Sequence, residues 1–174
     1  NPGKLNYASG GSGTTAHLAG ELFKSMAGTF ITHVPYRGSA AALTGFMQGQ
    51  IDLMFVELAA TLQHVQAGRL KILAMGTKQR SSALPNVPTV AETLPGFFVT
   101  VWFGLVAPPN TPLAVTAKLS AAVTEVMKSP DMVSALQGLS ITPVGSSPQE
   151  FQRFTEEEVQ RWGKVIREAR IVVD

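Results

Sequence analysis

The stretch that decides the fold is LNYASGGSGTTAHLAGELFKSMAG, residues 5–28. A short extended run over Lys4–Ala8 meets a turn of glycine and serine, and a helix is predicted from about Thr14. Its two leucines and a methionine recur every fourth position over residues 18–26, as one face of a helix requires. Gly28 then offers a left-handed helix stop. The stretch therefore predicts one strand–turn–helix unit.

The same unit repeats along the first hundred residues. Further apolar runs that are typical of strands are Phe30–Val34, Ile51–Phe55 and Leu70–Met75. The helices predicted between them are Ser39–Gln48, ending at Gly49, and Ala59–Ala67, ending at Gly68. Short apolar strands that alternate with helices predict a parallel sheet covered on both faces, with right-handed crossovers. The predicted fold class is therefore α/β.

The character of the sequence changes near residue 98. The segment Lys78–Pro95 is rich in loops, with one short helical stretch at Thr89–Leu94, and Phe98–Ala107 is a long apolar strand candidate. Helix starts follow at three pairs of a hydroxyl residue and a proline, which are Thr111-Pro112, Ser129-Pro130 and Ser147-Pro148. Glu150 completes a capping box with Ser147. We expect two domains, residues 1–98 and residues 99–174.

The composition excludes several classes of protein. The chain has no cysteine, which removes disulfides, thiolate metal sites and cysteine nucleophiles. Its 14 basic and 12 acidic residues give a net charge of +2 without a basic cluster, so nucleic-acid binding is not expected. No apolar run reaches the ~18 residues of a membrane helix, and the first residues lack the pattern of an export signal.

Three loops follow predicted strands and precede predicted helices, and in an open parallel sheet ligands bind at that edge. They are Ser9–Thr14, Tyr36–Ser39 and Val56–Ala59. The first loop presents backbone N–H groups and several hydroxyls at the positive end of a helix, which suits a phosphate or a carboxylate. The alternative is that its glycines and serines only make a tight turn with an N-cap.

The second loop adds a cation. Arg37 is suited to a bidentate contact with a carboxylate, unless it is only an exposed arginine beside a turn. The N–H groups of the loop and the Ser39 hydroxyl are the better candidates for contact.

The first loop also matches a nucleotide-binding pattern. The run from Gly11 to Ala16 fits G-x-G-x-x-G/A after a strand and before a helix. No acid follows between Glu21 and Asp52 to hold a ribose, although Arg37 would suit a 2′-phosphate. The alternative function is therefore an NADP-dependent oxidoreductase domain that uses the Gly11–Gly13 loop.

Other constellations do not assemble a catalytic or metal site. His17 and Glu21 lie one helical turn apart without an evident third metal ligand, and a histidine beside such a loop is more often a structural hydrogen-bonding residue. His33 and His64 are isolated, and Asp52 is expected to pair with a neighbouring backbone group or base. Without a credible acid, base or nucleophile, we expect neither an enzyme nor a cofactor.

Several stretches, in order, carry a resemblance to one protein family. They are Leu5–Gly13, His17–Phe23, Val34–Ser39, Gly49–Phe55, Leu84–Glu92 and Trp102–Leu105 with Ala107-Pro108. On these stretches the chain resembles the substrate-binding receptors of tripartite tricarboxylate transporters, also called Bug receptors. The resemblance runs from Leu5 to about Ile171.

The resemblance implies a type II periplasmic-binding-protein fold whose two lobes close around a ligand. Residues 1–98 would form lobe two, and residues 99–174 a crossover strand and C-terminal helices that complete lobe one. The chain would then be a C-terminal fragment without the export signal and the first part of lobe one.

The function that the resemblance implies is capture of a small organic carboxylate in the periplasm, without a cofactor. The ligand would be a di- or tricarboxylate, an amino acid or an aromatic acid. The implied partners are the membrane components of the transporter, and the truncated chain could also pair with a second copy of itself.

Carried over position by position, the resemblance places ligand contacts in all three loops. The candidate ligand-binding residues are Ser9, Gly11, Ser12, Gly13, Thr14, His17, Tyr36, Arg37, Gly38, Ser39 and Glu57. Many members have an Asp-Asn pair where this chain has Val56-Glu57. As a hypothesis, Glu57 favours a ligand that bears an amine or a hydroxyl.

Overall fold

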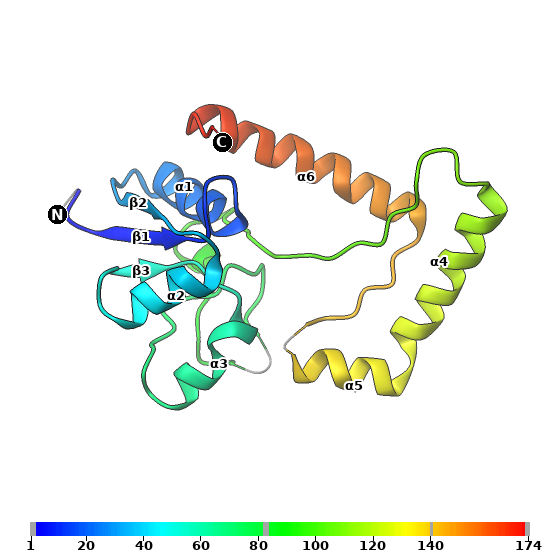
Figure 1. Cartoon of the computed structure of the whole chain (residues 1–174), viewed down its shortest axis with the longest axis horizontal. Helices are drawn as coiled ribbons and strands as arrows, with labels where there is room; N and C mark the ends of the chain where they lie inside the picture. Colours follow the sequence, from blue (N-terminus) through cyan, green and yellow to red (C-terminus); the bar gives the residue numbers. More distant parts are fainter. Residues whose placement is uncertain (1–2, 82–83, 140, 173–174) are drawn as a thin grey trace. The chain divides into compact units, whose positions relative to one another are not determined.

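A computed structural model of the chain describes residues 3–81, 84–139 and 141–172. The chain divides into two compact units (Figure 1). Unit 1 comprises Asn1–Val101 with Trp162–Asp174, and unit 2 comprises Trp102–Arg161. The predictions for Asn1-Pro2, and for Ser82-Ala83 in the loop-rich segment, lie outside the described residues.

Unit 1 contains a parallel sheet of three strands, β1 (Asn6–Ser9), β2 (Thr32–Pro35) and β3 (Leu53–Met54), in the order β2-β1-β3. The starts of β1 and β3 are joined by reciprocal hydrogen bonds. The N–H of Asn6 donates to Asp52 Oδ2 at 2.8 Å, and the N–H of Asp52 donates to Asn6 Oδ1 at 3.0 Å. The predicted parallel sheet is confirmed, and so is the expected backbone pairing of Asp52.

Each strand of unit 1 is followed by a helix. These are α1 (Thr15–Ala27), α2 (Ser39–Met47) and α3 (Leu58–Gln66). The glycines predicted to stop them have left-handed φ angles of 60° at Gly28, 74° at Gly49 and 68° at Gly68. Residues with a Cβ rarely adopt these angles, so each helix ends where glycine can take up the left-handed conformation. The predicted stops are confirmed.

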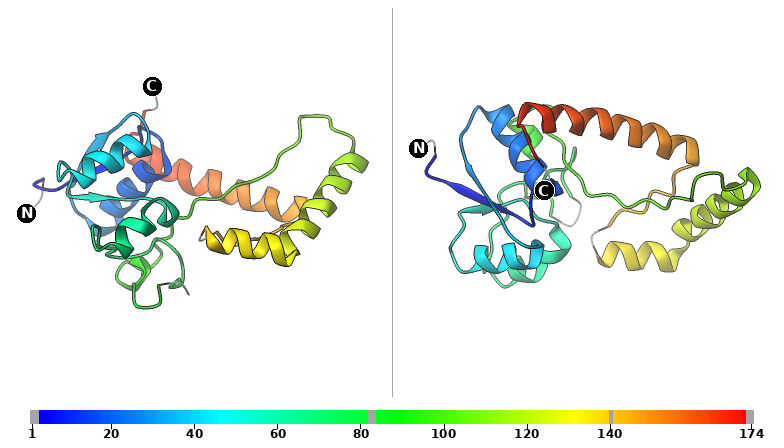
Figure 2. Two further views of the ribbon diagram at one scale, coloured as in Figure 1. Left: turned by 60° about the horizontal axis from the view of Figure 1, so that its bottom comes forward. Right: turned by 45° about the horizontal axis from the view of Figure 1, so that its top comes forward.

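The central strand sends alternate side chains to opposite faces of the sheet, and each face carries a helix. Tyr7 is fully buried toward α1, where its hydroxyl donates to Glu21 Oε1 at 2.8 Å. Ala8, also fully buried, packs with Ala42 of α2 and with Ile51. The helices α1 and α2 therefore cover opposite faces (Figures 1 and 2), as predicted.

Two predicted strands are not formed. Leu70–Met75 makes one isolated bridge, and its Leu73 side chain is 70% exposed. Phe98–Ala107 runs as coil, and Phe103 is 84% exposed. Both runs have the composition of a strand, but a strand also needs a neighbour for its backbone N–H and C=O groups. In the first run Met75 exchanges such bonds with Pro88 and Val90, and in the second the N–H of Val99 donates to the carbonyl of Gly76, which is too little pairing for a strand.

The helices after residue 89 follow the predicted starts in part. The stretch expected at Thr89–Leu94 is one 3₁₀ turn, η1 (Val90–Glu92), held by a capping box from Thr89. Three long helices follow, which are α4 (Leu113–Lys128), α5 (Pro130–Gly138) and α6 (Pro148–Glu168). None of the helices that the structure describes has both the length and the apolar character needed to cross a membrane.

Two of the three predicted hydroxyl caps are confirmed. Ser129 Oγ accepts from the N–H of Met132 at 3.4 Å, with Pro130 at the first helical position. Ser147 Oγ accepts from the N–H of Glu150 at 3.3 Å, and Glu150 Oε2 accepts from the N–H of Ser147 at 2.8 Å. The cap at Thr111 is wrong, because its hydroxyl donates to the carbonyl of Pro108 at 2.8 Å and α4 begins two residues later.

Gly20 of α1 lies against the buried Tyr7 ring, and a Cβ added at Gly20 would overlap that ring. Because Tyr7 is fully buried and hydrogen-bonded, its ring cannot move away from an added methyl group. We expect Gly20→Ala to lower the free energy of unfolding by roughly 1–3 kcal/mol, measured by urea unfolding followed by circular dichroism. Gly138→Ala is the control, since a Cβ there meets no atom within 4 Å. Equal stability of the two variants would contradict the expected clash.

Candidate functional site

The carboxyl ends of the three strands lie at one edge of the sheet, because all three run parallel. The loop Ser9–Thr14 follows the central strand, Tyr36–Ser39 follows β2, and Val56-Glu57 follows β3. The helices that begin after these loops are α1, α2 and α3. The structure thus brings the three predicted loops to the same edge.

The first two loops are joined by backbone hydrogen bonds. The N–H of Tyr36 donates to the carbonyl of Ser9 at 2.9 Å, and the N–H of Gly38 donates to the carbonyl of Gly10 at 2.9 Å. A Cβ on Gly10 would lie 2.9 Å from the backbone nitrogen of Ser39, so this approach requires glycine. The two loops form one surface, which we call the ligand loops.

Ser9 lies beneath this surface and not on it. Ser9 is 0% exposed, and its hydroxyl oxygen lies 2.6 Å from His33 Nε2. The same oxygen accepts from the N–H of Gly11 at 3.1 Å and donates to the carbonyl of Gly11 at 3.0 Å. Thr14 closes the turn, since its hydroxyl also donates to the carbonyl of Gly11, at 2.8 Å. Both hydroxyls therefore shape the loop.

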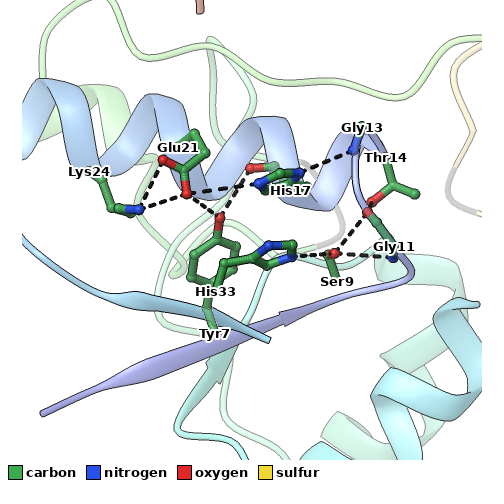
Figure 3. Close-up of polar contacts among 9 residues, drawn as sticks. All are labelled: Tyr7, Ser9, Gly11, Gly13, Thr14, His17, Glu21, Lys24 and His33. Carbon is green, nitrogen blue, oxygen red and sulfur yellow. Dashed lines mark hydrogen bonds and ion pairs between the residues drawn. The ribbon is translucent and has the colours of Figure 1, made fainter. Parts of the chain in front are cut away.

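His17 supports the other half of the same loop (Figure 3). It is 8% exposed, and its Nδ1 accepts from the N–H of Gly13 at 3.1 Å. Its ring stacks on the ring of His33 from β2, with centroids 3.8 Å apart and planes 9° apart. The structural role considered for His17 is thus observed. His33, predicted to be isolated, is instead part of the same cluster, and that prediction is wrong.

A charged group completes the cluster on the helix side. Glu21 Oε1 accepts from the Tyr7 hydroxyl at 2.8 Å and from Lys24 Nζ at 2.7 Å, and lies 3.9 Å from His17 Nε2 (Figure 3). Burial, followed by this hydrogen bond, raises the pKa of Tyr7 far above its ordinary value. Burial lowers the pKa of His17, and burial together with neighbouring His17 lowers the pKa of His33 to about 4. Both imidazoles are therefore neutral at pH 7.

The first turns of α1 and α2 leave hydrogen-bond donors open beside the ligand loops. Neither helix has a side-chain N-cap. Within the described chain, the first-turn amides without an acceptor are those of Thr15, Ala16 and His17 in α1 and of Ser39, Ala40 and Ala41 in α2. Over the same residues, the hydroxyls of Ser12, Thr15 and Ser39 also lack a hydrogen-bond partner. Such donors at helix N-termini suit an anion.

The glycine amides of the ligand loops are mostly occupied. Gly11 donates to Ser9, Gly13 to His17 and Gly38 to Gly10. These three glycines have φ angles of 136°, 77° and 99° in that order, which most residues with a Cβ avoid. Their observed role is to shape the turns, while the neighbouring serines and helix amides stay open.

The remaining predicted residues lie in different settings. The Tyr36 ring packs on Gly45 of α2 and joins the core cluster on that face, and its hydroxyl is 3.4 Å from Gln50 Oε1. Arg37 is exposed. Glu57 is exposed at the N-cap position of α3, and its side chain makes no capping hydrogen bond. The third loop shares the edge, but no contact joins Glu57 to the ligand loops among the described residues.

The geometry bears on two alternatives, a metal site and a dinucleotide site. Among the residues that the structure describes, no three His, Asp or Glu side chains gather to hold a metal ion. The occupied amides of Gly11 and Gly13 also disfavour the dinucleotide alternative, because a pyrophosphate would have to displace Ser9 and His17.

Comparison with known proteins gives a consistent result. The family model described as "Tripartite tricarboxylate transporter family receptor" matches residues 1–171. A Pseudomonas sp. (strain P51) relative, "UPF0065 protein in tcbD-tcbE intergenic region", is 39% identical over 173 residues, which cover 98% of this chain and 52% of the relative. The chain spans about half the length of the first curated relatives that it matches.

Solved structures show the same fold. "R. palustris Rpa4515 with adipate" has a TM-score of 0.88 and 36% identity, covering 100% of this chain and 58% of that one. "Structure of periplasmic binding protein BugD" has a TM-score of 0.83 and 27% identity, covering 100% and 59%. The predicted periplasmic-binding-protein fold is confirmed.

The histidine pair predicts how stability depends on pH. The unfolded chain takes up a proton at His33 near pH 6.5, whereas the folded chain does so only near pH 4. Between these values the unfolded state holds more protons, so the free energy of unfolding rises with pH from about 4 to about 6.5. The two pKa values correspond to about 3 kcal/mol. Because the His33 ring is partly exposed to solvent, we expect it to contribute on the order of 2 kcal/mol to this rise.

Urea unfolding at several pH values tests this expectation. His33→Gln keeps an N–H group near the position of Nε2 without the titration, and should flatten the rise. The carboxylates of Glu92 and Glu150, whose pKa values are lowered by Arg80 and by Ser147, titrate in both proteins and cancel in the difference. His64→Gln is the control for removing a histidine. Identical pH profiles for wild type and His33→Gln would refute the assignment.

Proposed function

The chain belongs to the tripartite tricarboxylate transporter receptor family, and on that premise we propose that it is part of a periplasmic receptor that captures a small organic carboxylate. The observation that carries the proposal is the pair of uncapped first turns, in α1 and α2, beside the joined ligand loops. The structural relative with 36% identity, "R. palustris Rpa4515 with adipate", supports the same ligand class.

The carboxylate would exchange its water shell for fixed donors. Its oxygens would accept from first-turn amides of α1 and α2 and from the hydroxyls of Ser12, Thr15 and Ser39. The positive ends of the two helix dipoles add to these bonds, and hydrogen bonds to an ionised group are the stronger kind. The site needs neither a metal nor a cofactor to hold an anion in this way.

Within this proposal the predicted residues fall into two groups. Ser12, Thr15 and Ser39 contact the first carboxylate of the ligand. The exposed Arg37, in the second loop, is available to a second carboxylate. The residues that shape and support the loops are Ser9, Gly11, Gly13, Thr14, His17, Tyr36 and Gly38. Glu57 lies at the β3 end of the same edge and acts on the part of the ligand that is not a carboxylate.

The wider assignment follows the family. We propose that residues 1–98 belong to lobe two of a two-lobed receptor and that residues 99–174 complete lobe one. Hinge closure of the lobes would enclose the ligand, and the closed form would be recognised by the membrane components of a tripartite transporter. The family consists of receptors, and we propose that the chain catalyses no reaction.

Calorimetric titration of the complete encoded protein tests the ligand class. The panel is adipate, malate, citrate, aspartate, benzoate and NADPH at pH 7.5. We expect at least one carboxylate to bind and Ser39→Ala to weaken it about fivefold to tenfold, as loss of one hydrogen bond to a charged group implies. Ser25→Ala, on an exposed position late in α1, is the matched control. Binding of NADPH alone would favour the oxidoreductase alternative instead.

Glu57 predicts a preference within the ligand class. Its exposed carboxylate has no ion-pair partner among the described residues, so it is available to an amine or hydroxyl of the ligand. We expect Glu57→Gln to weaken aspartate or malate binding about threefold to tenfold relative to succinate, which has neither group. Titration of the three acids side by side measures the ratio. An unchanged ratio would remove Glu57 from the specificity site.

A further inference from the structure

Five ionisable side chains form a cluster that reaches the Ser9–Thr14 loop through its two histidines, although carboxylate binding by amides and hydroxyls does not require them. They are Tyr7 of β1, His17, Glu21 and Lys24 of α1, and His33 of β2 (Figure 3). Two of them, His17 and His33, make hydrogen bonds to the loop itself. The charge state of this cluster is therefore coupled to the shape of the loop.

The hydrogen bond from Gly13 fixes the protonation state of His17. Nδ1 of His17 accepts from the N–H of Gly13 at 3.1 Å, which requires a free electron pair on that nitrogen. A doubly protonated imidazole donates from both nitrogens and has no pair to offer. Protonation of His17 would thus place two N–H groups against each other and release Gly13.

The stacked ring of His33 has a similar constraint. The two imidazoles lie 3.8 Å apart and nearly parallel, with planes 9° apart, so charge on one ring disfavours charge on the other. On its other side, His33 stacks on Tyr7 at 4.9 Å, and its Nε2 is 2.6 Å from Ser9 Oγ. Because the Ser9 hydroxyl donates to the carbonyl of Gly11, Nε2 of the neutral ring already donates to Ser9. A further proton on His33 would go to Nδ1 and add charge beneath the Gly11 turn that Ser9 holds.

Glu21 offsets such a charge only in part, because its carboxylate raises the pKa of His17 while Lys24 lowers it. Its Oε1 already accepts from Tyr7 at 2.8 Å and from Lys24 at 2.7 Å, and Lys24 also donates to Oε2 at 2.9 Å. The His17 Nε2 lies 3.9 Å away from that same Oε1. Because Lys24 balances the carboxylate, a protonated His17 would bring a net positive charge into a buried cluster.

We infer that the His17–His33 stack is a pH-sensitive positioning device for the ligand loops, which holds Gly13 in place while both rings are neutral and releases it on acidification. Its last step, a loss of carboxylate affinity, rests on the proposed function. Direct electrostatics predicts the opposite sign, since a new positive charge under an anion site would tighten binding. The sign of the pH effect therefore separates loop release from simple attraction.

The first experiment needs no ligand. ¹⁵N NMR across pH 7.5 to 4 reports the tautomer and protonation of each imidazole and the chemical shift of the Gly13 amide. We expect His17 to be unprotonated at Nδ1 at pH 7.5, and the Gly13 amide to move as the stack takes up a proton. His17→Asn keeps an acceptor near the position of Nδ1 and should remove that movement, whereas His64→Gln should leave it. A Gly13 amide that ignores histidine protonation in the wild type would overturn the inference.

The second experiment uses adipate as the probe, at pH 7.5 and at pH 4, where the stack takes up a proton. The double variant His17→Asn/His33→Gln leaves His64 as the remaining histidine of the three in the chain. We expect affinity to fall with acid about tenfold more in the wild type than in the double variant, as loss of a loop hydrogen bond implies. Protonation of adipate itself is common to both proteins and cancels in this ratio.

Equal ratios in the two proteins, or a wild type that binds more tightly in acid, would overturn the affinity step. If no carboxylate binds at any pH, the proposed function fails, while the response of the Gly13 amide still decides whether the stack positions the loop. The two failures are therefore distinguishable.

Discussion

The alternation of side chains along β1 governs the rest of unit 1. Because Tyr7 and Ser9 point toward α1 while Ala8 points toward α2, the central strand serves two packed faces with only four residues. The same alternation puts the Ser9 hydroxyl beneath its own loop, next to His33. Packing of the sheet and geometry of the binding edge are therefore set by one short strand, and neither can change without the other.

Much of this fold is predictable from local signals. Glycine stops and serine caps depend on a few neighbouring residues, so Gly28, Ser129 and Ser147 mark helix ends and starts correctly. The apolar runs Leu70–Met75 and Phe98–Ala107 resemble strands because composition records burial preference and not the presence of a partner. A strand is defined by its neighbour, and a single sequence carries little information about which segments become neighbours.

The candidate site shows the same limit. Its loops can be located, because a glycine-rich turn between a strand and a helix is a local pattern. Which loop residues support the turn and which stay open to a ligand cannot be predicted in the same way. The Gly13 amide is hydrogen-bonded to His17, one helical turn later, and the Ser9 hydroxyl is hydrogen-bonded to His33 from another strand. The spacing of His17 and Glu21 indicates that they contact each other, but His33, which stacks on His17, comes from β2. Glu21 joins that cluster by accepting from Tyr7, and not as a metal ligand.

The open first turns of α1 and α2 have a consequence for how such a protein evolves. Replacing Thr14, the N-cap residue of α1, with aspartate would satisfy first-turn amides of that helix and make it more stable. The same carboxylate would occupy the position of the ligand and repel it. Under the proposed function, the helix ends would stay uncapped, and the bound solute would supply the hydrogen-bond acceptors that the chain itself leaves out.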